Sequence, residues 1–297
     1  MTTDGAPSLP PSAEVVVIGG GVMGTSIAFH LAEAGVTDVL LLERGHLGGG
    51  STVKAAGGVR AQFSDPVNIA LGMRGLDAFE DFPHRPGQVI DLHQPGYLFL
   101  LTDPDQVRVY EESVALQNRM GLPSRMLTAH EAKALSPAID TTGVLAAAFH
   151  ARDGYCSPES VVLGYATGAR RHGATVLSGV GVSGVRVEDG QVVGVVTDRG
   201  EVRTGAVICA AGAWSKEVGA MVGVDLPVEP LRRQILITEP LSEEQAERFP
   251  LDMPMTIDAA TTFYLHREGP AILLGMSYRQ EEPGFREEYS DAWLPDL

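Results

Sequence analysis

A short apolar run followed at once by glycines is the feature that most constrains how this chain can fold. Residues 14–18 are rich in β-branched side chains and predict a buried parallel strand. The hexapeptide Gly19-Gly20-Gly21-Val22-Met23-Gly24 follows, and residues 22–34 contain good helix formers that end at Gly35. A second apolar run covers 38–42. This order predicts a βαβ unit that begins a domain.

The hexapeptide fits the pattern G-x-G-x-x-G, and each conserved position of that pattern has a physical role. Gly19 permits a tight turn, Gly21 lets the backbone approach a pyrophosphate, and Gly24 lets the helix pack closely on the strand. The helix N-terminus then stabilises the phosphate charge. Glu43 ends the second strand nineteen residues after Gly24 and is placed to accept hydrogen bonds from the adenosine ribose. The pattern predicts a dinucleotide site without deciding between FAD and NAD.

Composition excludes several classes of partner. The chain has 297 residues, 44% of them hydrophobic and 20% charged, which is ordinary for a folded globular protein. A formal net charge of −16 argues against a nucleic-acid or anionic-membrane partner. Two cysteines are too few for a zinc site, so we predict no metal, and Cys209 lies in an apolar run that predicts a buried strand.

The N-terminal and apolar segments give expectations about location. Residues 1–12 are rich in Pro, Ser and Thr, lack the basic and apolar regions of a signal peptide, and predict a disordered tail. No apolar run reaches transmembrane length. We therefore expect a cytoplasmic protein without a membrane span.

The rest of the chain alternates between helical and strand patterns. We expect helices over 67–79, 104–120, 129–135 and 157–172, the last with Ser157 as N-cap and Pro158 at its first position. We expect strands over 97–100, 175–178, 180–187, 191–197 and 200–203, with turns at Asp189-Gly190 and Arg199-Gly200, and strand-like segments over 226–238 and 262–276. These elements fall into two interleaved sets, one α/β with an antiparallel meander and one mostly antiparallel.

Several further stretches together resemble the D-amino-acid oxidase superfamily of FAD-dependent proteins, and most closely its glycine and sarcosine oxidase-like members. The nearest group is the sarcosine oxidase β-subunit and its relatives. The stretches are Glu43-Arg44, Gly50-Ser51-Thr52, Ala56-Gly57-Gly58-Val59-Arg60, Gln62-Phe63-Ser64, residues 94–100, Asp153-Gly154-Tyr155 and residues 207–215.

The resemblance implies an α/β fold in which a Rossmann-like FAD-binding domain is interleaved with an α+β substrate domain built on an antiparallel sheet. We expect the FAD-binding domain over 13–87 and 152–222, and the substrate domain over 88–151 and 223–297. The cofactor-binding residues that the pattern and the resemblance imply are Gly19, Gly21, Gly24, Glu43, Arg44, Ser51, Thr52, Ala56, Gly57, Gly58, Val182, Ala211, Gly212 and Trp214.

The resemblance also implies substrate-side residues. Arg60 falls where sarcosine-oxidising members keep an arginine that binds the substrate carboxylate, a task that suits a planar guanidinium. Tyr264 and His266 are candidates for the substrate face, and Tyr97 is a weaker one. A tyrosine or histidine on a strand is more often packed than catalytic.

The chain departs from the family pattern in four places. Lys54 stands where some relatives attach FAD through a histidine, so we predict non-covalent FAD, and Pro158 stands near a flavin-bearing histidine of others, so we predict no FMN. Leu273 stands near the position of an oxygen-activating lysine, which leaves the electron acceptor open. The sequence stops before the family's final strand and helix, so we expect a partner subunit or a missing segment to complete the flavin site.

These inferences favour one function over two alternatives. The favoured function is FAD-dependent oxidation of the CH–NH bond of a small amine or amino acid, of the sarcosine, glycine or D-amino-acid type, by hydride transfer to flavin N5. One alternative is an FAD-dependent 2-hydroxy-acid dehydrogenase on the same fold. The other is a truncated, non-catalytic flavoprotein or complex subunit.

Overall fold

A computed structural model describes residues 8–297, which group into two compact units. Unit 1 comprises residues 8–55, Pro83–Ile90 and Ser157–Pro230, and unit 2 comprises Ala56–Phe82, Asp91–Cys156 and Leu231–Leu297. The chain therefore crosses between the units several times. Residues 56–82, which we had assigned to the FAD-binding domain, cluster with unit 2 instead.

The predicted disordered tail, residues 1–12, lies partly outside the described residues, which begin at residue 8. Within the described part, Leu9 packs against the apolar core of unit 1 and Ser12 forms a parallel bridge with Arg203. The Arg203 amide also donates a hydrogen bond to the Pro11 carbonyl at 3.1 Å. Residues 9–12 are thus part of the fold, which corrects the expectation of a tail up to residue 12.

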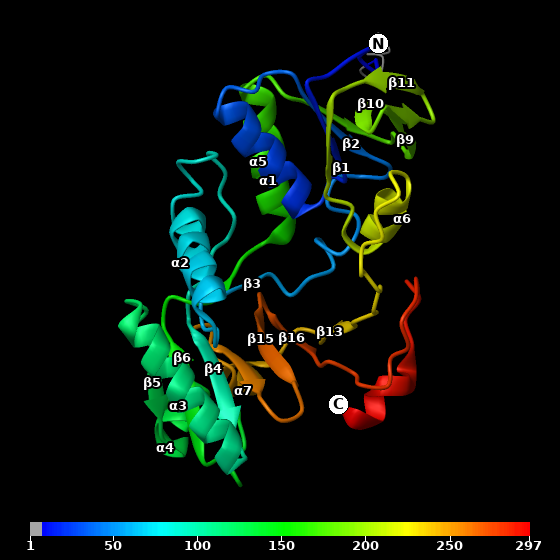
Figure 1. The fold of residues 1–297 in the computed structure, drawn as a ribbon. Helices are drawn as coiled ribbons and strands as arrows, with labels where there is room; N and C mark the ends of the chain where they lie inside the picture. The colour runs from blue at the N-terminus through cyan, green and yellow to red at the C-terminus, as the bar shows by residue number, and fades with distance from the viewer. Residues whose placement is uncertain (1–7) are drawn as a thin grey trace. The chain divides into compact units, whose positions relative to one another are not determined.

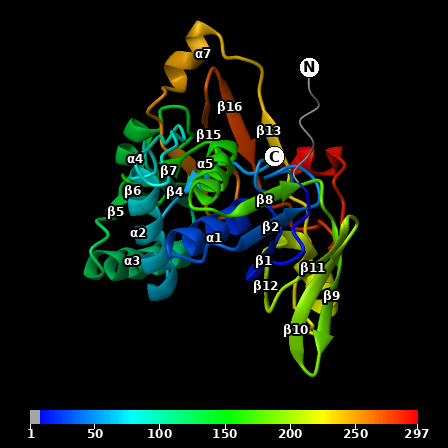
Figure 2. The same ribbon diagram turned by 90° about the horizontal axis from the view of Figure 1, so that it is seen from above.

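Unit 1 is built on a parallel sheet with the order β12-β1-β2-β8 (Figure 1). The strands are β1 (Val15–Ile18), β2 (Val39–Glu43), β8 (Thr175–Ser178) and β12 (Ala206–Cys209). Helices α1 (Val22–Glu33) and α5 (Pro158–Arg171) pack side by side against it (Figures 1 and 2), and the short helices η1 (Gly212–Trp214) and α6 (Ser215–Ala220) follow β12. This is the predicted α/β organisation.

Local sequence explains where these helices begin and end. Gly35 follows α1 with φ +102°, a left-handed conformation that favours glycine. The Ser157 side chain accepts a hydrogen bond from the Ser160 amide at the start of α5, with Pro158 at the first helical position. Both features were predicted. Cys209, expected in a buried strand, is instead exposed because β12 lies at the edge of the sheet.

An antiparallel meander extends unit 1 beside β12 (Figure 2). Its strands are β9 (Val182–Glu188), β10 (Gln191–Thr197) and β11 (Gly200–Arg203). Asp189 and Gly190 form the first turn, both with positive φ, as predicted. The second turn is Asp198-Arg199 rather than Arg199-Gly200, because Gly200 already pairs with Thr197.

Unit 2 is built on a seven-stranded sheet with the order β13-β16-β15-β14-β4-β6-β5. Its strands are β4 (Tyr97–Leu101), β5 (Arg125–Leu127), β6 (Ala146–His150), β13 (Ile235–Ile237), β14 (Met255–Asp258), β15 (Tyr264–Glu268) and β16 (Ala271–Gly275). All neighbours are antiparallel except β14 and β4. A small antiparallel pair joins β3 (Gly58–Val59) to β7 (Gly154–Tyr155). The sheet is therefore mixed but mainly antiparallel.

Apolar side chains on the two faces of this sheet form two cores. Tyr97, Phe99 and Leu101 point to one face, and the alternating Leu98 and Leu100 point to the other. The helices of unit 2 are α2 (Pro66–Glu80), α3 (Pro104–Arg119), α4 (Ala129–Leu135), α7 (Glu243–Arg248) and η2 (Asp291–Asp296).

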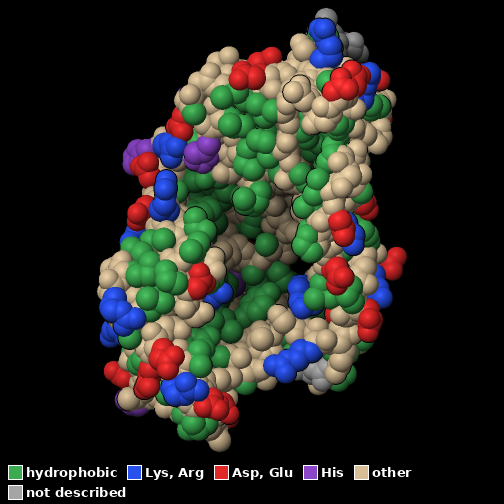
Figure 3. All heavy atoms as spheres, in the orientation of Figure 1, with side chains coloured by type: hydrophobic (Ala, Val, Ile, Leu, Met, Phe, Trp, Pro, Cys, Tyr) green, Lys and Arg blue, Asp and Glu red, His purple; other side chains and the backbone are tan. Residues whose placement is uncertain are grey.

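The two predicted strand-like segments near the end of the sequence have different outcomes. The segment 262–276 is strand-like as predicted, a hairpin of β15 and β16, whereas 226–238 contains only the short strand β13. Acidic and basic side chains are interspersed over the face drawn in Figure 3. Among the described residues, no helix is both long and apolar enough to cross a membrane.

Candidate functional site

The glycine turn of unit 1 has a backbone that side chains would block. Gly19 has φ +111°, and a Cβ there would lie 2.4 Å from the Ala210 carbonyl oxygen. A Cβ at Gly24 would lie 1.8 Å from the Gly19 carbonyl oxygen. Contacts this close are prohibitive for any side chain, so β1, α1 and the end of β12 approach one another only because these residues are glycine.

The N-terminus of α1 faces a hydroxyl group from the loop after β2. Gly21 is the N-cap and has no side chain to cap the helix, and the Val22 amide donates a hydrogen bond to Thr52 Oγ1 at 3.1 Å. A Cβ at Gly21 would also lie 3.1 Å from that oxygen. The loop is tied down by the Gly48 amide, which donates to the Gly20 carbonyl at 2.8 Å. Thr52 thus lies where a helix N-terminus binds an anion.

Glu43 ends β2 beside the same turn. Its Oε2 accepts a hydrogen bond from the Gly20 amide at 2.7 Å, and its Oε1 accepts one from the Gly45 amide at 2.7 Å. The two bonds fix the carboxylate at the strand end, and each oxygen keeps a lone pair that a ribose hydroxyl can use.

The remaining predicted cofactor residues of unit 1 lie on its neighbouring loops and strand ends. The Arg44 guanidinium lies 4.1 Å above the Trp214 ring, and a Cβ at Gly50 would be 3.6 Å from the same ring. Ala211 and Gly212 follow β12, with Gly212 at φ +54°. Val182 begins β9 and packs on the core, and Ser51 is exposed in the loop. A glycine backbone, a helix N-terminus with a hydroxyl and a carboxylate at a strand end together fit a dinucleotide.

The predicted turn Ala56-Gly57-Gly58 belongs to unit 2, where it packs closely on its neighbours. Gly57 has φ +69°, and a Cβ there would lie 2.1 Å from the Cys156 carbonyl oxygen. A Cβ at Gly58 would lie 2.0 Å from the Tyr97 hydroxyl oxygen. The Cys156 amide donates to the Gly57 carbonyl at 2.9 Å. Gly57 is therefore needed for this close backbone packing, and a side chain at Gly58 would have to displace the Tyr97 phenol.

Arg60 follows β3 and is half-buried among aromatic rings. Its guanidinium carbon lies 4.5 Å from the centre of the Phe63 ring and 5.4 Å from that of Phe99, and Nη1 donates to the Gln62 carbonyl at 3.3 Å. Within residues 8–297, no carboxylate pairs with it within 4.0 Å. This guanidinium thus carries a positive charge without an ion-pair partner from the described chain.

Two tyrosines lie in the same electrostatic environment. Tyr97 is buried, and burial raises the pKa of its phenol, an effect that the nearby Arg60 guanidinium partly offsets. Burial also raises the pKa of Tyr264, which in turn disfavours ionisation of Tyr97. Both phenols therefore stay protonated near neutral pH and can donate hydrogen bonds. Of the substrate-side candidates, Arg60 and Tyr97 interact electrostatically, and so do Tyr97 and Tyr264.

His266 has different surroundings. Its side chain is fully buried, its ring stacks on Tyr155 with centres 4.1 Å apart, and Nδ1 lies 2.7 Å from the Arg267 carbonyl oxygen. Burial lowers its pKa, so the ring is neutral near pH 7. His266, predicted for the substrate face, therefore lies in the protein interior, packed against the Tyr155 ring.

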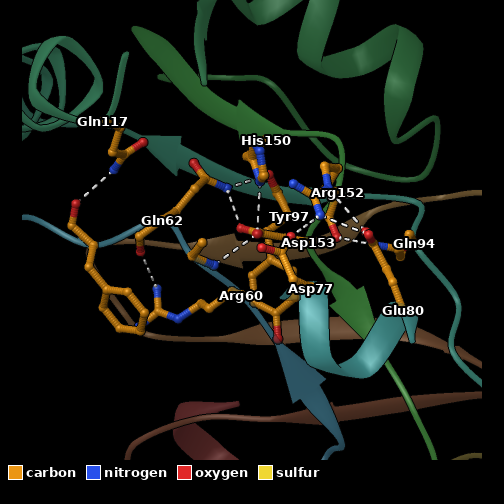
Figure 4. A network of polar contacts seen from close by, with 12 residues as sticks. Arg60, Gln62, Asp77, Glu80, Gln94, Tyr97, Gln117, His150, Arg152 and Asp153 are labelled. Atoms are coloured by element: carbon orange, nitrogen blue, oxygen red, sulfur yellow. Dashed lines mark hydrogen bonds and ion pairs between the residues drawn. The ribbon is translucent and has the colours of Figure 1, made fainter. Parts of the chain in front are cut away.

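A buried polar network beside Arg60 was missed by the sequence analysis (Figure 4). Asp153 and His150 are almost fully buried and lie 2.8 Å apart, and Asp153 also binds Ala61 and Gln62. Asp153 had been noted only as part of a family-like stretch. His150 lies three residues from Asp153, but Gln62 and Ala61 lie 91 and 92 residues away, so no local pattern could have revealed the network as a whole.

Comparisons with known proteins agree with this fold. Residues 14–296 match the family described as FAD dependent oxidoreductase (DAO). The chain is 32% identical to mitochondrial dimethylglycine dehydrogenase of Rattus norvegicus, over 97% of this chain and 36% of that protein. It is 28% identical to sarcosine oxidase subunit beta of Rhodobacter capsulatus, over 77% of this chain and 56% of that protein.

A solved structure extends the comparison to three dimensions. L-proline dehydrogenase from P. horikoshii is 32% identical and superposes with a TM-score of 0.89, covering 97% of this chain and 75% of that one. The chain spans only about a third of the length of the dimethylglycine dehydrogenase that it matches. The predicted resemblance is confirmed: this chain belongs to the DAO family of FAD-dependent oxidoreductases.

Proposed function

We propose that this protein oxidises the CH–NH bond of a small amine that carries a carboxylate, such as sarcosine, glycine or another amino acid, with non-covalently bound FAD. The observation that carries the proposal is Arg60, a half-buried guanidinium set among aromatic rings and without an ion pair to the described chain. Because an unpaired, partly desolvated cation attracts an anion strongly, a substrate carboxylate is its natural partner.

The residues of unit 2 have separate tasks in this proposal. Arg60 binds both carboxylate oxygens through its planar fork, which fixes the orientation of the α-carbon. The protonated phenols of Tyr97 and Tyr264 are available as further hydrogen-bond donors, and Phe63 and Phe99 pack against the guanidinium and limit its access to water. Bound FAD would accept the hydride of the substrate C–H bond, which leaves an imine that water hydrolyses.

The residues of unit 1 hold the dinucleotide. The α1 N-terminus and Thr52 bind the pyrophosphate, and Glu43 binds the ribose. Lys54 stands where some relatives carry the histidine that attaches FAD, which supports non-covalent binding. Acid precipitation of the purified protein should therefore release all of its flavin to the supernatant.

Substrate-driven bleaching of the flavin tests the proposal. The FAD-loaded protein is mixed anaerobically with sarcosine, glycine, proline and D-amino acids, and in parallel with glycolate and lactate. Loss of the oxidised-flavin absorbance with an amine supports the proposal and names the substrate. Bleaching with a hydroxy acid alone would replace it with the 2-hydroxy-acid dehydrogenase alternative.

Absence of flavin bleaching would argue against catalysis. Flavin that binds and stays oxidised with every compound would contradict catalysis by this chain. It would favour a non-catalytic or partner-dependent subunit, an alternative that similarity to a sarcosine oxidase subunit makes worth testing.

A further inference from the structure

The polar network of unit 2 centres on a buried carboxyl group whose oxygens are both in use (Figure 4). Asp153 Oδ1 accepts a hydrogen bond from the Ala61 amide at 2.9 Å and lies 2.8 Å from His150 Nδ1. Oδ2 lies 3.2 Å from Gln62 Nε2, which also donates to the Tyr97 carbonyl at 3.1 Å. Asp153 and His150 are 0% and 1% exposed. A buried carboxyl group is stable only with such a complete set of partners.

These contacts hold the chain directly after Arg60, and other contacts hold it on both sides. Before Arg60, Val59 pairs with Gly154, the residue next to Asp153. After it, the Gln117 amide of α3 donates to the Phe63 carbonyl at 2.8 Å. The backbone that carries Arg60 is therefore fixed from residue 59 to residue 63, whereas the guanidinium itself has only one hydrogen bond to the part of the chain that the structure describes.

Asp153 lies near the Arg60 backbone without pairing with the guanidinium. The amide of Ala61, the residue after Arg60, donates to Asp153 Oδ1, and among residues 8–297 the ion-pair partner of Asp153 is His150. A free carboxylate there would compete with a substrate for the guanidinium. Because Ala61, Gln62 and His150 occupy its oxygens, Asp153 instead orders the loop and leaves Arg60 open.

We propose that Asp153, supported by His150, is a positioning residue that fixes the Arg60 loop and keeps the guanidinium available to a substrate carboxylate. The inference rests on the proposed function, because it assumes that Arg60 binds the substrate. It adds a residue that acts through Arg60 and does not itself touch the substrate.

The test compares Asp153→Asn with Asp77→Asn. Asparagine has one acceptor oxygen in place of two, so its amide nitrogen must face a donor that the carboxyl group had accepted. Asp77 is an exposed acid of the same unit, paired with Arg152 at 2.8 Å, and serves as the matched control. Binding of acetate to the FAD-loaded protein is measured by titration calorimetry, and amide exchange of residues 58–63 by mass spectrometry.

We expect Asp153→Asn to bind acetate about tenfold more weakly, the scale of a charge-assisted hydrogen bond, and to exchange faster over residues 58–63. With sarcosine, KM should rise more than kcat falls. Asp77→Asn should match the wild type in all three measurements. Wild-type binding and exchange in Asp153→Asn would overturn the inference.

Two further variants separate the possible failures. If Asp153→Asn does not fold, Gln62→Leu decides, since it removes a single arm of the network; unchanged acetate binding and exchange in that variant would overturn the inference. Arg60→Ala tests the assumption that Arg60 binds the substrate carboxylate. If Arg60→Ala binds acetate weakly while Asp153→Asn binds it normally, only the inference fails. If Arg60→Ala binds acetate as the wild type does, the proposed carboxylate anchor fails as well.

Discussion

The two candidate binding regions of this protein are held in place in different ways. In unit 1, the hydrogen bonds of the dinucleotide region join residues 23 and 30 positions apart, namely Gly20 with Glu43 and Val22 with Thr52. In unit 2, the Arg60 loop is held by Asp153, 91 and 92 positions away. The first region depends on backbone geometry that glycine permits, and the second depends on buried side chains. Cofactor binding and substrate binding should therefore be lost through different kinds of substitution.

The largest effect should come from blocking the glycine turn. Gly24→Val places a Cβ about where the Gly19 carbonyl oxygen lies, so α1 must move away from β1. We expect FAD affinity to fall about 100-fold or more, measured by quenching of free FAD fluorescence. Gly205→Ala is the control in unit 1, because a Cβ there meets nothing within 4 Å. Normal FAD binding by Gly24→Val would show that this turn does not hold the cofactor.

Removal of the Arg60 guanidinium should weaken substrate binding in unit 2 and leave FAD binding in unit 1 unchanged. Arg60→Ala should raise KM for sarcosine about 100-fold with FAD affinity unchanged, because a desolvated ion pair to the substrate is lost. Arg60→Lys should recover part of the loss, since it keeps the charge without the planar fork. Arg108→Ala, an exposed arginine of α3, is the control for charge. Equal losses in Arg60→Ala and Arg108→Ala would point to net charge rather than a specific anchor.

A smaller effect is expected at Thr52, where a substitution tests whether the α1 N-terminus binds the FAD pyrophosphate. Thr52→Val removes the hydroxyl that accepts from the Val22 amide, and we expect FAD affinity to fall about fivefold, the scale of one hydrogen bond. Thr52→Ser keeps the hydroxyl and should bind FAD as the wild type does. The same loss in both variants would mean that the Thr52 methyl group matters and the hydroxyl does not.

The smallest effect concerns the packing of His266. Burial lowers its pKa in the folded state, so the unfolded chain binds more protons as pH falls below about 6.5, the ordinary histidine pKa. The buried, neutral histidine is therefore compatible with full stability above that pH. As the solution is acidified below it, the free energy of unfolding falls by at most about 1.4 kcal/mol per pH unit. His266→Gln should show a smaller drop in unfolding free energy between pH 7.5 and 5.5, measured by urea denaturation. An unchanged drop would show that His266 does not titrate with folding.

The sequence predicts features that rest on neighbouring residues better than features that depend on distant ones. The β1–α1–β2 unit, Ser157 as a helix N-cap and the Asp189-Gly190 turn were predicted because each rests on neighbouring residues. The exposure of Cys209 and the short β13 within 226–238 were not, because they depend on the position of a strand in its sheet. The Asp153 network was not predicted either, because Ala61 and Gln62 reach Asp153 only after distant parts of the chain have folded together.

One anaerobic titration of sarcosine into wild type, Arg60→Ala and Gly24→Val, each incubated with FAD and followed by flavin absorbance, tests whether substrate and cofactor are bound by separate regions. We expect bound flavin that bleaches in the wild type. We expect bound flavin that bleaches only at about 100-fold higher sarcosine in Arg60→Ala, and little bound flavin in Gly24→Val. Bleaching of Arg60→Ala at the same sarcosine concentration as the wild type would contradict a carboxylate anchor in unit 2 that is separate from the dinucleotide region of unit 1.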